Sequence, residues 1–173
     1  MITHKALSVF IWLISKIDNI VFHPTEPKVI AILDWEMSTV GDSLVDLANL
    51  CVMYVMPRSK KSALSGLADL DLKSLGVPTR NELVNMYYLC TMSNSNIDAA
   101  PITFDEIQKW SGFYLAFVVF KYAVIIHGIM QRSKSGVASS ERADEVAKAL
   151  PFICSMAQSI LDTEVKFNTT SRL

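Results

Sequence analysis

The sequence predicts an α+β fold that is mostly α, with one β-hairpin near the amino terminus packed against a bundle of helices. Residues 19–34 contain two apolar segments around a proline-bounded turn, and the spacing of apolar residues becomes helical after Trp35. The chain has 173 residues, of which 51% are apolar and 19% charged. That length and composition suit one domain with a buried core.

Residues 19–23 and 28–34 are the predicted strands of the hairpin, and the second is rich in Val and Ile. The sequence PTEP between them predicts a turn, because proline fixes φ and removes a backbone donor. The first seventeen residues are expected to be helical or irregular.

The first helix is expected in GDSLVDLANLCVMYV, residues 41–55, where apolar residues recur at helical spacing. Asp42 lies near its start, where a carboxylate is favourable to the helix dipole, and Pro57 ends it. Residues 58–78 are interpreted as a loop with a short turn around 67–72.

Two capping boxes predict the next helices. Thr79 with Glu82 opens a helix that runs to about residue 91, and Thr103 with Glu106 opens another that runs to about residue 132, with a bend at Gly112.

A last helix is expected after the loop SKSGVASS. Ser140 is its expected cap, and it continues to about Asp162 despite Pro151.

The charge pattern and the cysteines argue against a nucleic-acid-binding protein and against a zinc-binding protein. The net charge is −1, and no basic stripe indicates nucleic-acid binding. Cys51, Cys90 and Cys154 are scattered and odd in number, which suits a reducing compartment where each thiol is a small core residue. No Cys–His spacing indicates zinc.

Two apolar runs are candidates for a signal peptide or a membrane-spanning segment. Residues 6–14 have the length of a signal-peptide core but lack a small-residue cleavage site. The run Phe113–Met130 contains Lys121 and His127, which favours a helix buried in protein, so no membrane span is expected.

The candidate site lies at the open end of the predicted hairpin. A carboxylate such as Asp34, at the end of an apolar strand, is poorly solvated unless a positive partner meets it, and Mg²⁺ shared with phosphate is one such partner. Antiparallel pairing brings Asn19, at the entrance, to the same rim. The alternatives are that Asp34 caps the following helix and that Asn19 simply begins a strand.

Three stretches carry a resemblance to a known family: DNIVFHPTEP, VIAILDWEMSTVGDSLVDLANL and FYLAFVVFKYAVIIHGIMQRSKSGVASS. They resemble the aminoglycoside phosphotransferase (choline-kinase-like) family, in particular the kinase-like domain of acyl-CoA dehydrogenase family members ten and eleven. The resemblance implies a protein-kinase-like carboxyl-terminal lobe over residues 17–162. Residues 1–16 are then a divergent segment and residues 163–173 a tail.

The resemblance also implies roles for individual residues. Asn19 and Asp34 match the family's two Mg²⁺ ligands. Asp46 matches a carboxylate that supports the catalytic loop, and Gly41 and Asp42 match the turn before the helix. The implied cofactors are Mg²⁺ and ATP, and the implied substrate is a small hydroxylated molecule, with a hydroxyacyl-CoA as the candidate from the subgroup.

The sequence departs from the family at the catalytic loop, HGDxxxxN. The position of the catalytic Asp holds Ile14, and the His and Gly positions hold Trp12 and Leu13. The glycine-rich loop and the strand lysine of an amino-terminal lobe are also missing from the sequence. We therefore expect little or no phosphotransfer by this chain alone, and the alternative function is a pseudokinase-type interaction module with a protein partner.

Other residues were weighed for chemistry. His23 and His127 are candidates for proton transfer, but are expected beside Pro24 on the hairpin and on a crowded helix face, respectively. One set of aromatic residues could line an acyl or base pocket, although helical spacing favours core positions for most of them. The set is Trp110, Phe113, Tyr114, Phe117, Phe120 and Tyr122.

The last three residues, Ser171-Arg172-Leu173, resemble a peroxisomal address of the SKL type. Peroxisomal delivery is therefore one expectation for an intracellular protein, with the mitochondrion and the cytoplasm as alternatives.

Overall fold

A computed structural model describes residues 8–11, 19–58, 65–93, 102–136 and 143–165. Its strands are β1 (Ser8–Ile11), β2 (Ile20–Phe22), β3 (Val29–Ile32) and β4 (Thr39–Asp42), with a short 3₁₀ helix at Trp35–Met37. Its helices are α1 (Leu44–Val55), α2 (Arg80–Ser93), α3 (Phe104–Lys134), α4 (Ala143–Ala147) and α5 (Leu150–Glu164). The predicted mostly helical α+β fold is confirmed.

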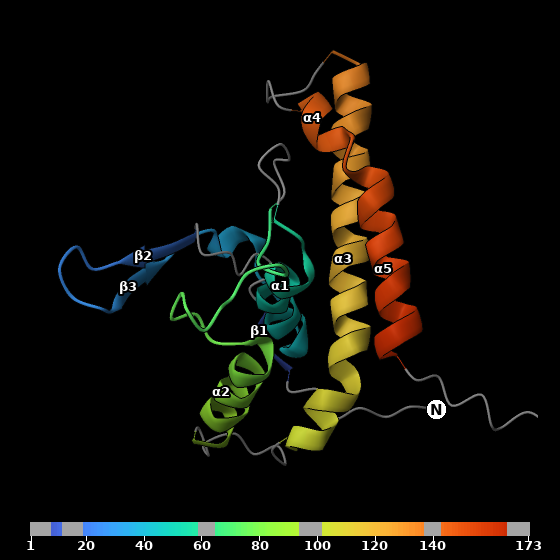
Figure 1. The fold of residues 1–173 in the computed structure, drawn as a ribbon. Coiled ribbons are helices and arrows are strands. Elements are labelled where there is room, and N and C mark those ends of the chain that lie inside the picture. Colours follow the sequence, from blue (N-terminus) through green and yellow to red (C-terminus); the bar gives the residue numbers. More distant parts are fainter. Residues whose placement is uncertain (1–7, 12–18, 59–64, 94–101, 137–142, 166–173) are drawn as a thin grey trace, which may run out of the picture.

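The predicted hairpin is formed by β2 and β3, which pair antiparallel with Ile20 opposite Ile32 and an irregularity beside Phe22. The backbone N–H of His23 donates to the carbonyl of Lys28 (2.9 Å) and closes the turn. The hairpin projects away from the helices (Figure 1), and all four β3 residues are exposed. A hairpin packed against the helical bundle, as the sequence suggested, is therefore wrong.

A second two-stranded sheet joins β1 to β4, with Ser8 opposite Asp42 and Ile11 opposite Thr39. The expectation of helical or irregular structure before residue 17 is wrong for these four residues. SVFI contains residues with good β propensity, but its partner strand comes about thirty residues later, where local patterns give no signal.

Helices α2 and α3 begin where the capping boxes predicted. The Thr103 side chain accepts a hydrogen bond from the N–H of Glu106, whose carboxylate accepts from the N–H of Thr103 (2.9 Å). The same reciprocal pair joins Thr79 and Glu82 at the start of α2. The first turns of α3 are inclined to the rest of the helix (Figure 1), and the helix is continuous through Gly112.

The predicted last helix is instead two helices, α4 and α5. Pro151 lies in the first turn of α5, where its missing N–H costs nothing, because the first N–H groups of a helix have no intrahelical acceptor. The proline therefore marks a helix start where we had expected a helix interior. Ser140, the predicted cap, lies outside the described residues.

The core lies between α1, α3 and α5, with α3 at the centre (Figure 1). Fully buried side chains come from α1, α3 and α5: Val52, Ile107, Leu115, Val118, Val119 and Ile153. Val84 adds the contribution of α2. The helical bundle therefore has a continuous apolar interior that the hairpin does not share.

Within the described part of the chain, α3 is the one helix long and apolar enough to cross a membrane. The criterion is one of length and composition, and core helices of soluble proteins also meet it. Only 33% of its most apolar window is buried, so α3 is less enclosed than the sequence suggested.

Candidate functional site

The open end of the hairpin brings Asn19 and the end of β3 together. The backbone N–H of Leu33 donates to the carbonyl of Asn19 (2.8 Å), one residue beyond the last paired strand positions. Asp34 follows immediately, so the entrance and the exit of the hairpin are neighbours, as antiparallel pairing predicted. That Asn19 and Asp34 bind a metal stays a prediction.

Asp34 has a left-handed backbone conformation, with φ 62° and ψ 36°. Among the described residues other than glycine, it is the one with a positive φ. This conformation costs an L-residue about 1–2 kcal/mol, although Asp and Asn tolerate it best. It turns the chain out of β3 into the 3₁₀ helix, and sequence reasoning did not foresee it.

The capping alternative for Asp34 is not supported. Asp34 is at the N-cap position of the 3₁₀ helix, but its side chain makes no capping hydrogen bond there. A non-glycine residue in this conformation is characteristic of functional sites, where the backbone aims a side chain.

The donor atoms at this rim fit Mg²⁺ in kind. An amide oxygen from Asn19 and a carboxylate from Asp34 are hard oxygen ligands, and Mg²⁺ is usually held by one or two carboxylates together with phosphate oxygens. The described residues contain no group of three or more His, Cys, Asp or Glu side chains that could hold a metal. The pair therefore suits an ion shared with a phosphate better than an ion enclosed by protein.

Asp42 joins three elements of the structure. One of its carboxylate oxygens accepts the backbone N–H of Leu44 (3.0 Å) at the start of α1, and the other accepts the hydroxyl of Tyr114 (2.5 Å) on α3. Burial, and then the hydrogen bond to Asp42, raise the pKa of Tyr114, which stays protonated as the donor. Asp42 thereby ties the β4–α1 junction to the central helix.

The neighbouring positions also connect to the bundle. Gly41 pairs with Val9 in the β1–β4 sheet, and Ser43 accepts the hydroxyl of Tyr87 from α2 (2.6 Å). Asp46 lies in the first turn of α1, where its negative charge interacts favourably with the helix dipole. The supporting roles of Gly41, Asp42 and Asp46 in a catalytic loop stay predictions, since residues 12–18, where that loop would lie, are outside the described part of the chain.

Sequence reasoning missed a partly buried polar pair between α1 and α3. Asn49 on α1 is only 5% exposed, and its side-chain oxygen accepts a hydrogen bond from the ammonium of Lys121 on α3 (3.1 Å). The signal was a polar residue on the apolar face of each helix. The charge of Lys121, which favoured a protein-buried helix over a membrane span, therefore has a hydrogen-bond acceptor within the fold.

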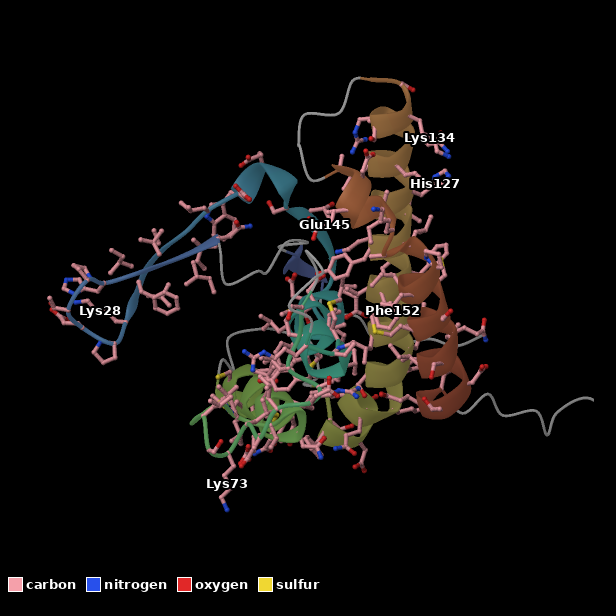
Figure 2. All side chains as sticks on the ribbon, turned by 45° about the horizontal axis from the view of Figure 1, so that its top comes forward. Lys28, Lys73, His127, Lys134, Glu145 and Phe152 are labelled. Atoms are coloured by element: carbon pink, nitrogen blue, oxygen red, sulfur yellow. The ribbon has the colours of Figure 1, made fainter. Side chains whose placement is uncertain are left out.

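Of the two histidines, His23 is partly buried at the turn of the hairpin and His127 is exposed. His23 Nδ1 accepts the backbone N–H of Glu26 (3.1 Å) and so shapes the turn of the hairpin. His127 is exposed, with Gln131 as a side-chain neighbour (3.2 Å), so the expected crowded face is wrong. Figure 2 shows His127 on the side of α3 away from the hairpin.

The aromatic set divides between core and surface. Trp110, Tyr114 and Tyr122 are partly buried against the core. Phe113, Phe117 and Phe120 are exposed, so the expectation of core positions is wrong for these three. Their spacing matched a helix face, but that face points outward.

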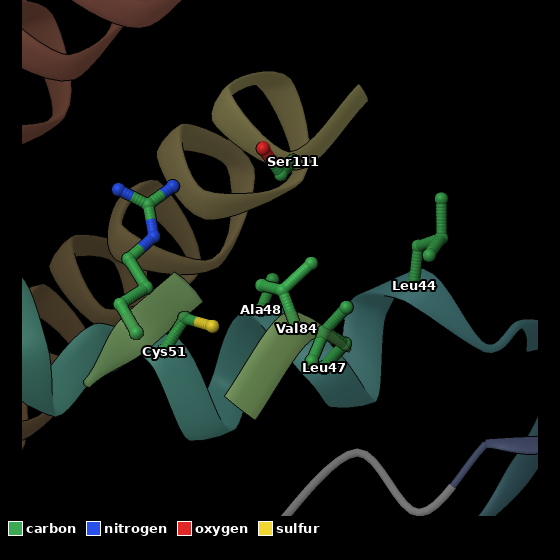
Figure 3. A pocket seen from close by; sticks show the side chains of 7 residues that line it. Leu44, Leu47, Ala48, Cys51, Val84 and Ser111 are labelled. Carbon is green, nitrogen blue, oxygen red and sulfur yellow. The ribbon is translucent and has the colours of Figure 1, made fainter. Parts of the chain in front are cut away.

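Among the helices that the structure describes, two cavities bear on the question of a ligand site. The first is a narrow apolar gap between α1, α2 and α3, in which Cys51 and Val84 take part (Figure 3). The second is a polar hollow of about 180 Å³ beside Arg80 and Glu164, below the roughly 300 Å³ of a typical small-molecule pocket. No hairpin residue lines either cavity. Neither cavity therefore corresponds to the nucleotide site of a kinase.

The cysteines are partly as expected. Burial raises the pKa of the Cys51 thiol, an effect that the nearby Arg80 guanidinium opposes, so Cys51 is an unreactive core residue. Cys90 and Cys154 are exposed, so a core position is wrong for them.

Several predicted positions lie outside the described residues. They are Trp12, Leu13 and Ile14, which occupy the catalytic-loop positions, and Ser171, Arg172 and Leu173 at the carboxyl terminus.

Comparison with known proteins places these features in a family. The phosphotransferase enzyme family matches residues 16–78, which include the hairpin, Asp34 and α1. A solved structure described as an aminoglycoside phosphotransferase, from Ralstonia eutropha JMP134, superposes with a TM-score of 0.76 and 31% identity. The match covers 92% of this chain and 44% of that one.

The sequence is also similar to acyl-CoA dehydrogenase family members. Member 10 of Mus musculus is 38% identical over 82% of this chain, and member 11 of Homo sapiens is 38% identical over 73%. Member 11 of Gallus gallus is 32% identical over 91%.

The chain spans only 12%, 14% and 19% of the lengths of these three relatives. The family match, the relatives and the shared fold agree: residues 16–78 match the phosphotransferase enzyme family, and the chain has the kinase-like fold of an aminoglycoside phosphotransferase.

Proposed function

We propose that this chain is a partial kinase-like domain that retains the metal-binding end of an ATP- and Mg²⁺-dependent phosphotransferase. The observation that carries the proposal is the rim of the hairpin, where Asn19 is joined to Leu33 by a backbone hydrogen bond and Asp34 has a left-handed conformation. When bound, Mg²⁺ would neutralise phosphate oxygens.

The relatives support the proposed substrate class. Phosphotransferases of this family act on small molecules, and similarity to acyl-CoA dehydrogenase family members supports a hydroxyacyl-CoA. Phosphoryl transfer depends on positioning and on charge compensation, and the residue at the base position is Ile14. The chain alone is expected to turn over ATP slowly or not at all.

Metal binding is tested with Mn²⁺ in place of Mg²⁺, followed by electron paramagnetic resonance in the presence of ATP. Asn19→Ala and Asp34→Asn should each weaken Mn²⁺ binding at least about tenfold, as losing a ligand costs at least 1.4 kcal/mol. Glu36→Gln removes an exposed carboxylate two residues away and should leave the affinity unchanged.

Equal Mn²⁺ affinity in wild type and Asp34→Asn would show that this residue is not a ligand. Turnover of ATP with Mg²⁺ should be measured in parallel. Any activity that survives in Asp34→Ala would also contradict the assigned role.

A non-catalytic interaction module is the second candidate function, favoured by the exposed apolar surface of the hairpin. Its side chains are between 37% and 53% exposed, far more than is usual for so many apolar groups on one small element. They are Phe22, Val29, Ile30, Ile32 and Leu33 on the hairpin, together with Trp35 at the start of the 3₁₀ helix that follows it. A partner protein that binds wild type but not Ile30→Lys, with Mn²⁺ affinity unchanged, would support this function.

A further inference from the structure

A stripe of exposed side chains runs along the outer face of α3. We call it the α3 seam, and it consists of Phe113, Phe117, Phe120, Val124, His127 and Gln131. The first four are 41%, 47%, 59% and 57% exposed. The opposite face of the same helix is buried, with Leu115, Val118 and Val119 fully covered. A helix that is apolar on both faces requires a second covering partner.

The spacing of the seam specifies what kind of partner fits. Successive residues are four, three, four, three and four positions apart, which is the heptad spacing by which one helix packs along another. An aromatic side chain can bury about 150–250 Å², so three half-exposed phenylalanines leave roughly 250–350 Å² of apolar surface uncovered. This area approaches the largest patches on monomeric proteins, and its linear shape matches a helix.

We propose that the α3 seam binds the α3 seam of a second copy of this chain, with the two helices antiparallel across a two-fold axis. In heptad packing of this kind, Phe117 lies beside Phe120 of the second copy, and Phe113 beside Val124. A self-complementary patch of this type closes after two copies.

The charges at the ends of α3 set the antiparallel direction. Its first turn carries Asp105 and Glu106, and its last turn carries Arg132 and Lys134. An antiparallel pair places the acidic end of each helix beside the basic end of the other, and it also opposes the two helix dipoles. A parallel pair would bring like charges together at both ends.

The second copy can reach the seam without displacing the hairpin. Figure 2 shows His127 and Lys134 on the side of α3 away from the β2–β3 hairpin. The inference therefore uses neither the metal rim nor the apolar hairpin, and does not depend on the proposed function. Because the seam is smaller than the roughly 800 Å² per partner of a standard interface, the dimer should be in the micromolar range.

Sedimentation velocity of the full chain across a concentration series tests the dimer. Wild type should convert from the 19.3 kDa monomer to a species of about twice that mass. The double variant Phe117→Glu with Phe120→Glu should weaken association at least about tenfold, because both residues lie at the centre of the seam. Ile125→Glu is the matched control, since Ile125 is 49% exposed on the same helix but lies off the seam, and it should dimerise like wild type.

Disulfide trapping tests the direction, in a background where exposed Cys90 and Cys154 are changed to Ser. A mixture of Phe113→Cys and Val124→Cys chains should form the mixed disulfide. Phe113→Cys alone should not, because antiparallel helices hold the two copies of that residue about 16 Å apart along the axis. Efficient disulfide formation by Phe113→Cys alone would overturn the antiparallel arrangement.

A wild-type chain that remains monomeric across the series would overturn the proposal. So would dimerisation that the double variant leaves intact, or a monomer that instead binds phosphatidylcholine vesicles through the seam.

Discussion

Asp34 illustrates what a single residue contributes to the proposed site. Glycine adopts a left-handed backbone conformation at a lower free-energy cost than aspartate does. Local geometry alone therefore does not explain why a carboxylate occupies this position. The carboxylate makes no capping bond to the 3₁₀ helix that follows. Its position beside Asn19, whose carbonyl accepts the backbone N–H of Leu33, is compatible with the proposed metal shared with phosphate.

At Gly112, by contrast, the absence of a side chain is what the structure requires. A Cβ built there would lie 2.7 Å from the Cβ of Glu164 and 3.0 Å from its carbonyl oxygen, so the absence of a side chain lets α5 approach α3. At Gly128 the nearest atom to such a Cβ is a side-chain nitrogen of Arg132, at 3.5 Å.

We expect opposite effects when the two glycines are replaced by alanine. Gly112→Ala should lower the free energy of unfolding by about 1–3 kcal/mol through overpacking, despite the better helix propensity of alanine. Gly128→Ala should raise it by about 0.5–1 kcal/mol. Urea unfolding followed by circular dichroism measures both, and stabilisation by Gly112→Ala would show that the helices are farther apart in solution.

At the scale of elements, the helix starts were predictable and the breaks were less so. The capping boxes of α2 and α3 are contained in four residues each, so a short sequence window includes all the interacting groups. The break between α4 and α5 was missed because Pro151 suits a helix start as well as it disrupts a helix interior. Strand β1 was missed because its partner is distant in the sequence.

The capping box of α2 predicts an acid-dependent loss of stability. Hydrogen bonds from the backbone N–H and the hydroxyl of Thr79 (2.7 and 2.8 Å) lower the pKa of Glu82 from its ordinary value of 4.5. Because the folded pKa lies below the unfolded one, this stability is fully present above pH 4.5 and is lost as the pH falls through the folded value.

The measurement is the urea midpoint of wild type and Glu82→Gln between neutral pH and pH 3. Wild type should be the more stable at neutral pH, and the difference should shrink in acid. A difference that is the same at both ends of the range would mean that the carboxylate does not hold this cap in solution.

At the scale of the whole molecule, sequence periodicity identified apolar faces but not what covers them. Phe113, Phe117 and Phe120 have the same helical spacing as core residues, and their exposure depends on where α1 and α5 lie. The apolar hairpin was expected to pack on the helices for the same reason. In both cases the sequence identified an apolar face correctly. It did not show which distant segments would cover that face, and so it did not predict the exposure.

The separation of the hairpin from the bundle predicts two levels of stability within one chain. An isolated two-stranded hairpin is marginal in water, and β3 is exposed along its whole length. The central part of α3 is buried on one face by α1 and α5. Local opening should therefore expose the hairpin amides far more often than those of the bundle.

Hydrogen exchange read by mass spectrometry distinguishes the two parts. Amides in residues 19–33 should exchange faster than those in residues 115–126 by a factor on the order of 100 or more, which corresponds to about 3 kcal/mol of local opening. Low concentrations of urea should accelerate exchange in α3, which needs global unfolding, and leave the hairpin rate unchanged. Equal protection of both segments would mean that the exposed face of the hairpin is covered in solution, and that the hairpin unfolds together with the bundle.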